Sequence, residues 1–237
     1  MNSYQNSEKQ TPSPTGRAGV GLWWKILAVV LLVYTIVAGF LTDVPRLPIL
    51  HETIRNQYFH VCMWFAMMIL FTVGLIYSIK HLSKQKHGDD IIASEAVNVG
   101  ILMGILGLLT GSLWAKYTWG AWWTNDVKLN GAAITMLTYS AYLVLRNAIT
   151  DEQKRGKVSA VYNIFAYVMM LVFILIYPRM SDSLHPGNGG NPGFSSYDLD
   201  NNMRMVFYPA IIGWTLLGVW MMTLKIRIQN IKLKTEL

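Results

Sequence analysis

Six long apolar stretches limit what this chain can fold into more than any other feature of its sequence. A helix needs about 20 predominantly apolar residues to span the hydrocarbon layer of a membrane. Backbone that is not helical cannot face lipid, so the short polar intervals belong at the membrane surfaces or inside the protein. We therefore expect an all-α integral membrane protein, built as a bundle of six transmembrane helices. The expected spans are Leu22–Leu41, Tyr58–Ile79, Ala93–Leu113, Asn130–Ile149, Ala160–Tyr177 and Met205–Leu224.

The distribution of charge predicts how this bundle is oriented. Only 14% of the residues are charged, and the formal net charge is +7. Six of the 20 Lys and Arg residues fall on one side of the predicted bundle and fourteen on the other. The six are Arg46, Arg55, Lys116, Lys128, Arg179 and Arg204. Basic residues accumulate on the cytoplasmic side of membranes, so both termini are predicted to be cytoplasmic. The net charge then reflects topology and attraction to anionic lipid headgroups rather than nucleic-acid binding.

This topology places three connecting segments on the same outer face. They are the loops 42–57, 114–129 and 178–204, and the last of them contains the Gly/Pro/Asn-rich stretch Pro186–Gly193, which is expected to be flexible. The predicted domain boundaries are 1–21 for a disordered cytoplasmic N-terminal tail, 22–225 for the six-helix membrane domain and 226–237 for a basic cytoplasmic tail.

What the sequence lacks excludes several classes of protein. Cys62 is the single cysteine and lies inside an apolar stretch. The chain therefore has no internal disulfide, no Cys-rich metal site and no CxxCH motif for covalent haem attachment. It also has no P-loop motif for ATP hydrolysis, and no Ser–His–Asp or paired-carboxylate arrangement stands out. We expect a binding protein rather than an enzyme.

A stretch of ten residues in the second outer loop contains four of the nine tryptophans. They are Trp114, Trp119, Trp122 and Trp123, with Gly120 among them and Asp126 shortly after. A tryptophan buries a large flat apolar surface and keeps one N–H donor, which suits a site that is apolar on one side and wet on the other. The cluster favours a platform for a flat apolar ligand such as haem. A dense aromatic belt at the membrane interface is the alternative.

Two of the five histidines are candidate ligands for a haem iron. His60 lies at the outer start of the second span, with Asn56 and Trp64 one helical turn away on the same face. His185 lies in the last outer loop, in the sequence Ser-Leu-His-Pro-Gly. Neutral imidazoles from two separate segments can bind an iron from opposite faces of a porphyrin. The alternative is that two histidines fall at outer positions by chance. The other three, His51, His81 and His87, are expected at the solvated surface.

Basic residues on the outer side are candidate partners for haem propionates, through charge-assisted hydrogen bonds. Lys116 lies within the tryptophan cluster and Lys128 follows it, and these two are the preferred candidates, with Arg55 as a third. Pairing with lipid phosphate or with Asp126 is the alternative for each of them.

Glycines recur along one face of the third span. Gly100 and Gly104 form one GxxxG pair, and Gly107 and Gly111 form another. Such a face of small residues lets a neighbouring helix approach closely. We interpret it as packing within the bundle, and a contact between two copies of the chain is the alternative.

Taken together, these motifs resemble those of a known family. The segment Thr110-Gly-Ser-Leu-Trp-Ala-Lys, followed by Trp119-Gly-Ala-Trp-Trp and then Asp126, is similar to the WWD signature of the haem-handling proteins. Within that superfamily, residues 20–225 most resemble the CcmC family of cytochrome c maturation proteins. The likeness lies in length, six helices, one WWD loop and the flanking outer histidines.

The resemblance implies that haem b is held non-covalently at the outer face, over the tryptophan platform, with His60 and His185 as axial ligands. It implies delivery of haem to the haem chaperone CcmE for cytochrome c maturation. The ABC transporter subunits CcmA and CcmB and the small subunit CcmD are the other implied partners. The implied location is the cytoplasmic (inner) membrane, with the functional loops facing the periplasm or exterior.

The sequence departs from the family pattern at three positions, one of which is Cys62, where the family often has proline. Asn125 stands where the family usually has tryptophan, and Lys128 stands where it often has arginine. A lysine pairs less rigidly with a carboxylate than an arginine does. Two other functions remain as alternatives. One is a CcsA-like synthetase that attaches haem to apocytochrome c itself, and the other is a permease for a small solute.

Overall fold

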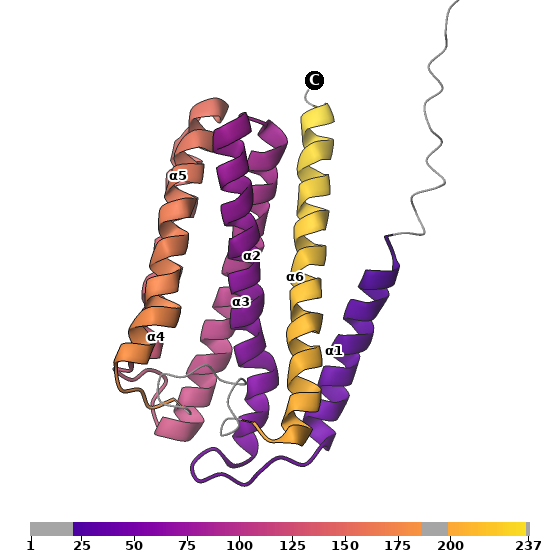
Figure 1. The fold of residues 1–237 in the computed structure, drawn as a ribbon, viewed down its shortest axis with the longest axis vertical. Coiled ribbons are helices and arrows are strands. Elements are labelled where there is room, and N and C mark those ends of the chain that lie inside the picture. Colours follow the sequence, from indigo (N-terminus) through magenta and orange to yellow (C-terminus); the bar gives the residue numbers. More distant parts are fainter. Residues whose placement is uncertain (1–20, 186–198, 236–237) are drawn as a thin grey trace, which may run out of the picture.

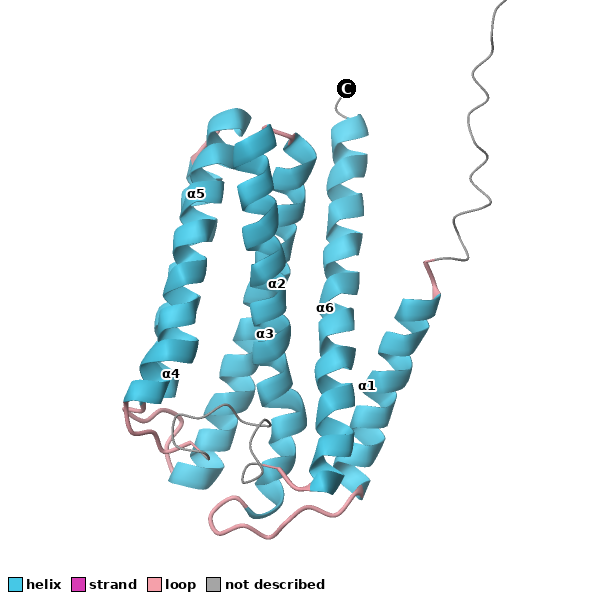
Figure 2. Cartoon of the chain, in the orientation of Figure 1, coloured by secondary structure: helices cyan, strands magenta, loops and turns pink. Residues whose placement is uncertain are grey.

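Residues 21–185 and 199–235 form an all-helical structure in a computed structural model (Figure 1), and Figure 2 shows no strand among them. Residues 1–20, 186–198 and 236–237 lie outside the described part of the chain, and they include the predicted flexible stretch Pro186–Gly193 and all of the predicted disordered tail except Gly21. The α-helices are α1 (Trp23–Leu41), α2 (Gln57–Lys84), α3 (His87–Trp119), α4 (Val127–Ala148), α5 (Glu152–Met170) and α6 (Asn201–Thr235). The shorter segments are η2 (His51–Asn56), η3 (Leu171–Ile176) and η4 (Tyr177–Met180).

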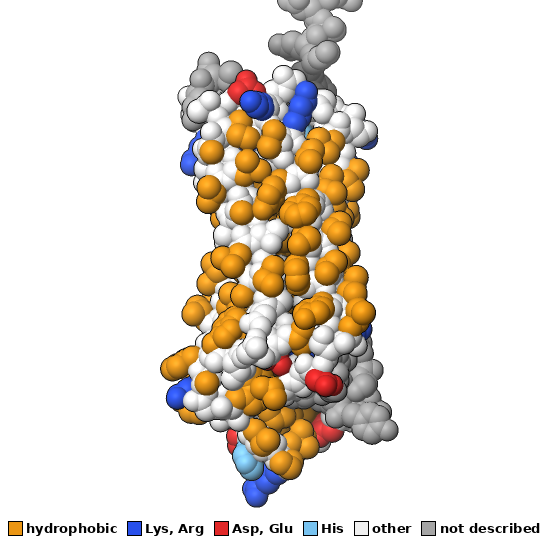
Figure 3. All heavy atoms as spheres, turned by 90° about the vertical axis from the view of Figure 1, so that its left-hand side faces the viewer, with side chains coloured by type: hydrophobic (Ala, Val, Ile, Leu, Met, Phe, Trp, Pro, Cys, Tyr) orange, Lys and Arg blue, Asp and Glu red, His pale blue; other side chains and the backbone are white. Residues whose placement is uncertain are grey.

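Most of these helices have the length and composition of membrane spans. They are α1, α2 with η2, α3, α5 with η3 and η4, and α6. Apolar side chains cover the middle of the molecule in Figure 3, whereas most charged side chains lie toward its two ends. The chain is therefore a multi-pass membrane protein. Polar residues such as Asn130, Thr135 and Thr138 interrupt α4, which is not among the five span candidates of the described residues. The count of six crossings stays a prediction.

Three connections meet at one end of the bundle, called the loop end below. They are residues 42–56, residues 120–126 and the segment that follows η4 (Figure 1). Helices α2 and α3 form the centre, α1 packs against α6 on one side, and α4 packs against α5 on the other. The α2–α3 connection, the α4–α5 connection and the last turn of α6 lie at the opposite end. Segments from the three predicted outer loops thus share one end of the molecule.

The helices extend further than the apolar stretches that predict them. Helix α3 continues to Trp119, so the irregular part of the predicted loop 114–129 is confined to residues 120–126. Helix α6 continues to Thr235, so the described part of the predicted tail is the end of a helix. A helix satisfies its backbone groups internally, so it can continue from lipid into the hydrated interface without losing backbone hydrogen bonds.

The four glycines on α3 form a row of slots that take side chains from α2. In order, Gly100, Gly104, Gly107 and Gly111 face Phe71, Met67, Trp64 and His60, and Met136 of α4 lies still closer to Gly104 than Met67 does. At each glycine, a Cβ atom would lie less than 3.0 Å from the α2 side chain that faces it. Both rows follow the three- and four-residue spacing of one helix face. The interpretation of this glycine face as packing within the bundle is confirmed.

The span predicted over Ala160–Tyr177 changes its winding before it ends. It is α-helical only up to Met170, and it continues as the π-helix η3 and the 3-10 helix η4. Short π-helical turns occur frequently at functional sites. The backbone carbonyl of Phe173 in η3 lies against Gly131 of α4, where any Cβ atom would collide with it. This close approach holds η3 against the first turns of α4.

Polar contacts join the helices at the opposite end. Arg146 of α4 donates to both carboxylate oxygens of Asp90 in α3, at 2.8 and 2.7 Å. Glu95 of α3 accepts from Lys225 and Gln229 of α6, each at 3.2 Å. These buried carboxylates tie α4 and α6 to the central helix.

The prediction that His81 lies at the solvated surface is wrong. Its side chain is buried, and its Nδ1 lies 2.9 Å from the carbonyl oxygen of Lys86. Helix α2 extends past its apolar stretch and carries His81 beneath Gly156 of α5, where a Cβ atom would lie 2.7 Å from the imidazole Nε2.

Candidate functional site

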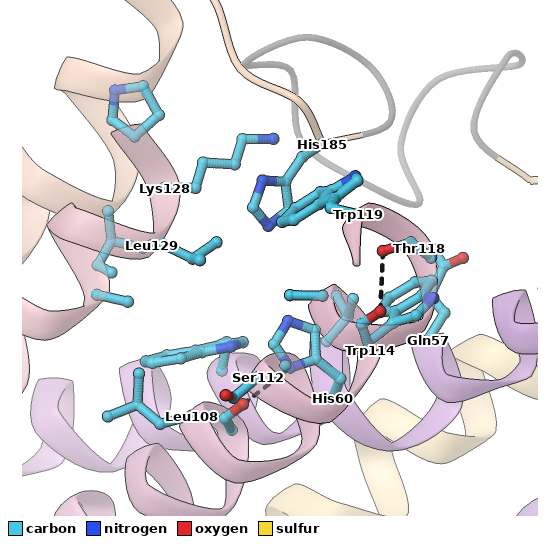
Figure 4. A pocket seen from close by; sticks show the side chains of 18 of the residues that line it. Gln57, His60, Leu108, Ser112, Trp114, Thr118, Trp119, Lys128, Leu129 and His185 are labelled. Atoms are coloured by element: carbon cyan, nitrogen blue, oxygen red, sulfur yellow. Dashed lines mark hydrogen bonds between the residues drawn. The ribbon is translucent and has the colours of Figure 1, made fainter. Parts of the chain in front are cut away.

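A cavity of about 320 Å³ lies at the loop end, between α2, α3, the start of α4, and η3 (Figure 4). Its volume falls within the range of about 300–1,000 Å³ that is usual for ligand pockets. Most of its lining is apolar or aromatic. The other side chains that line it are Gln57, His60, Ser112, Thr118, Lys128 and His185. A largely apolar cavity with a few convergent polar groups is suited to a ligand of mixed character.

His60 is held by the packing of α2 against α3. Its Nδ1 lies 2.9 Å from the carbonyl oxygen of Gly107 and 3.3 Å from the hydroxyl oxygen of Thr110. Because a carbonyl only accepts hydrogen bonds, Nδ1 carries the proton and Nε2 keeps its lone pair. The rings of Trp64 and Trp114 meet the imidazole edge-on, with centroids 6.2 and 5.9 Å away. The ring is therefore enclosed by two helices and two indoles.

His185 enters the same cavity from the irregular segment after η4. Its Nδ1 lies 3.0 Å from Oδ1 of Asp126. An ionised carboxylate only accepts, so Nδ1 again carries the proton. The ring of Trp119 meets this imidazole edge-on at a centroid distance of 5.0 Å. The His185 side chain remains 22% exposed, and within the described residues it stands on an irregular segment rather than on a helix.

Asp126 joins the start of α4 to the segment that carries His185. Its side chain is 1% exposed. Oδ1 accepts from the backbone N–H groups of Lys128 and Leu129, at 2.9 and 3.4 Å, which caps α4. Oδ2 accepts from the hydroxyl of Ser183 at 2.9 Å and from the backbone N–H of Leu184 at 2.7 Å. Asp126 does not line the cavity, although the sequence places it in the platform.

The contacts of Asp126 also determine its ionisation. Burial disfavours the charged form and by itself would raise the pKa of this carboxyl. The hydrogen bonds from His185, Leu184 and Ser183 outweigh burial and hold the pKa of Asp126 well below its usual range. The carboxylate is therefore ionised at neutral pH and remains an acceptor for the imidazole of His185.

The two histidines show the same arrangement. Their rings enter the cavity from opposite sides in Figure 4. Within the described parts of the chain, neither Nε2 has a hydrogen-bond partner. Metal-binding histidines typically donate their second ring N–H to a carboxylate or a backbone carbonyl, which fixes the ring and raises its basicity. Two oriented lone pairs thus face one apolar space, which fits an iron ion held in a flat macrocycle.

Three of the four clustered tryptophans reach the cavity. Trp114 and Trp119 lie on the last turns of α3, and Trp123 lies in the segment 120–126. Trp122 is 56% exposed and does not line the cavity. Gly120 ends α3 with a φ of 79°, a left-handed conformation that favours glycine. Its part in the platform is to turn the chain, because it does not line the cavity either.

Asn125 is tied to the first turn of α4. Its Oδ1 accepts from the side-chain amide of Asn130 at 2.7 Å. Oδ1 of Asn130 accepts in turn from the indole N–H of Trp123 at 3.4 Å. Asn125 therefore supports the loop through the amide of Asn130, which in turn binds the indole of Trp123.

Of the three basic residues predicted to contact propionates, Lys128 alone lines the cavity. The ammonium group of Lys116 donates to the carbonyl of Gly120 at 3.0 Å, at the end of its own helix. The guanidinium of Arg55 donates to the carbonyls of Gly39 and Thr42, at 2.9 and 2.6 Å. Arg55 thus caps α1, where the backbone carbonyls of the last turn need partners.

Several residues of the site are not predicted from the sequence. They include Gln57, Ser112 and Thr118 in the cavity lining, two further polar residues and one apolar wall. Thr110 contacts His60, and its position between Gly107 and Gly111 on α3 could have identified it as a site residue. Ser183 binds Asp126, and only its nearness to His185 points to it. The apolar wall is formed by Phe173, Ile174 and Leu175 of η3, and nothing in their sequence distinguishes them from other membrane residues.

The chain is similar in sequence to a known family and to several known proteins. The family model described as "CcmC: Heme exporter protein C" matches residues 11–236. The Heme exporter protein C of Rhodobacter capsulatus is 24% identical over 211 residues, which are 86% of this chain and 84% of that protein. That of Paracoccus denitrificans is 26% identical over 171 residues, 72% of this chain and 70% of that protein. The Cytochrome c biogenesis protein CcsA of Prochlorococcus marinus is 33% identical over 99 residues, 42% of this chain and 31% of that protein.

Proposed function

The chain belongs to the heme exporter protein C (CcmC) family, and on this premise we propose that it binds haem in the loop-end cavity and passes it to a haem chaperone. The haem is cargo for cytochrome c maturation, held without a covalent bond. The observation that carries the proposal is the pairing of His60 and His185. Both rings give Nδ1–H to an acceptor and turn Nε2 toward one shared cavity.

The proposal assigns a task to each part of the cavity. His60 and His185 provide the two axial bonds to iron, the strongest hold that a protein has on haem of this kind. Trp114, Trp119 and Trp123 provide flat apolar contact on the loop side. Lys128, which lines the cavity, pairs with a propionate. The chain binds, orients and shields its cargo, and any covalent step belongs to a partner.

The same proposal sets the chain in its membrane. We place six crossings in the cytoplasmic membrane, with both termini in the cytoplasm and the loop end facing the periplasm. The six-to-fourteen division of basic residues between the two sides supports this orientation. CcmE then receives haem at the loop end. CcmA, CcmB and CcmD are the further partners that membership of the family suggests.

The optical spectrum of the purified chain tests the proposal. We expect haem to copurify and to show a bis-imidazole absorption spectrum in the wild type. His60→Ala and His185→Ala should each lose that spectrum and much of the haem, because each removes one axial ligand. His51→Ala is the matched control, since His51 is exposed at the same end and does not line the cavity. An unchanged spectrum and haem content in either ligand variant would refute the assignment.

A CcsA-like synthetase is the second candidate, and the 99-residue likeness to a Cytochrome c biogenesis protein CcsA favours it. It differs from the first proposal in its product. A synthetase would form thioether bonds between haem and an apocytochrome with a CxxCH motif, without a chaperone. Incubation of the haem-loaded chain with such an apocytochrome, with and without CcmE, separates the two. We expect covalent product only when CcmE and the remaining maturation proteins are present.

A further inference from the structure

We propose that Asp126 is the positioning residue for His185. Its carboxylate fixes the tautomer and the direction of the imidazole, and it holds the segment 182–185 against the start of α4. The inference rests on the proposed haem-binding function, and it concerns how one of the two ligands is kept in place.

The geometry gives Asp126 three hydrogen bonds to three consecutive residues of this segment. They run from the Ser183 hydroxyl, the Leu184 N–H and the His185 imidazole, at 2.9, 2.7 and 3.0 Å. The Ser183 hydroxyl oxygen also lies 3.2 Å from the backbone nitrogen of His185 and accepts its N–H. A buried carboxylate that accepts several hydrogen bonds can keep its charge, and charge-assisted bonds are stronger than neutral ones.

The carboxylate is itself fixed in place by its helix. Asp126 caps α4 through the N–H groups of Lys128 and Leu129, so its oxygens cannot swing away without uncapping the helix. Because Asp126 is 1% exposed, water does not compete for these oxygens. Through this one side chain, the start of α4 fixes the position of the irregular segment 182–185 and the direction of Nε2 of His185.

The consequence for the ligand is a defined tautomer. With Nδ1–H committed to the carboxylate, the lone pair of His185 is on Nε2, which faces the cavity. A carboxylate partner also raises the basicity of an imidazole ligand. Loss of such a partner typically weakens metal binding by about 10- to 100-fold. We expect a loss of this size in haem affinity when Asp126 can no longer accept from His185.

Asp126→Asn tests the inference with little change in shape. Asparagine caps helices about as well as aspartate. Its single oxygen cannot serve all the donors, however. With its NH₂ group at the Oδ1 position it opposes the imidazole N–H of His185, and with that group at the Oδ2 position it opposes the Leu184 N–H. Asp151→Asn is the matched control, because Asp151 caps α5 through the N–H of Lys154 at 2.6 Å and lies exposed at the opposite end. We expect a 10- to 100-fold weaker haem affinity in D126N and no change in D151N.

A double variant separates positioning from general stability. If Asp126 acts through His185, D126N lowers haem affinity in the wild type and in His60→Ala, but adds no further loss to His185→Ala. An equal loss in all three backgrounds would overturn the inference in favour of a structural role. Nitrogen-15 NMR of the haem-free protein reads the tautomer of His185 directly. We expect Nδ1–H in the wild type and a shift toward Nε2–H in D126N, and an unchanged tautomer together with unchanged affinity would also overturn it.

Ser183→Ala keeps the inference testable if D126N does not fold. It removes one of the three ties and leaves the α4 cap intact. We expect a haem affinity about two- to tenfold weaker, the usual worth of one hydrogen bond, and an unchanged affinity would count against the inference. A wild type that binds no haem refutes the proposed function instead, and the NMR measurement still decides whether Asp126 sets the tautomer.

Discussion

His60 and His185 present the same nitrogen to the same cavity, but they are held there in different ways. His60 stands on a long helix, fits a glycine slot on its neighbour and donates to a backbone carbonyl. His185 stands on an irregular segment and donates to the side chain of a residue far away in the chain. A backbone acceptor is present wherever the helices pack, whereas a side-chain acceptor can be removed by one substitution. One ligand is thus secured by the fold and the other by a single residue.

The largest effect is expected at His60, the ligand that is held by helix packing. In Gly111→Ala the new Cβ atom would collide with the imidazole of His60. Extra atoms in a well-packed interface cost about 1–3 kcal/mol. We expect a lower Tm for the haem-free protein and loss of the bis-imidazole spectrum. Thermal unfolding and absorption spectroscopy measure the two effects.

Gly88→Ala is the control for that substitution. Gly88 lies on the same helix, and no heavy atom comes within 4 Å of the position that its Cβ would take. Alanine is about 1 kcal/mol more favourable than glycine inside a helix, so the Tm should hold or rise. Equal losses of haem in the two variants would mean that the slot beneath His60 has no special part in ligand placement.

A smaller effect is expected when the indole beside His185 is removed. Trp119→Leu keeps an apolar side chain but loses the edge-on ring contact with the imidazole. Aromatic pairs of this geometry contribute about 0.5–1.5 kcal/mol beyond their buried area. We expect a haem affinity roughly two- to tenfold weaker in a spectroscopic titration. Trp122→Leu is the control, since Trp122 is largely exposed outside the cavity, and a larger loss in that variant would reverse the assignment.

The smallest effect is expected for the charge in the cavity lining. Lys128→Met removes the ammonium group from the cavity. An ion pair open to solvent contributes about 0.2–1 kcal/mol and is screened by salt. We expect a loss of less than about fivefold in haem affinity at low salt, and a smaller loss at high salt. Lys116→Met should leave the affinity unchanged, because Lys116 donates to the carbonyl of Gly120 and lies outside the cavity lining.

The part of the site that lies on helices could be predicted well from the sequence. Apolar length locates the helices, and the row of glycines on α3 marks where α2 approaches closely. His60 and Trp64 share a face in the sequence and meet in the structure, because helical spacing is fixed by the backbone. The positions of the helix ends are harder to predict. Hydropathy reports where lipid contact stops, and α3 continues past that point to Trp119.

The contacts that depend on tertiary structure could not be predicted. Nothing in the spacing of residues 126 and 185 indicates that the carboxylate of Asp126 binds the imidazole of His185. The sequence also gives no means to distinguish Trp122 from its neighbours, since all four tryptophans suit a membrane interface equally. Arg55 looks like a free charge until the end of α1 is seen to lie beside it.

The matched rows on α2 and α3 limit how the ring of His60 can be repositioned. Phe71, Met67, Trp64 and His60 differ in size and shape, and each lies against one glycine of α3, with Met136 of α4 sharing the slot at Gly104, so the two helices fit in a single register. A slip by one turn, about 5.4 Å, would bring Trp64 or His60 to the wrong slot and mismatch the whole seam. The seam therefore permits only one register of α2 against α3. Fine adjustment of the grip on a ligand falls to the segment that carries His185.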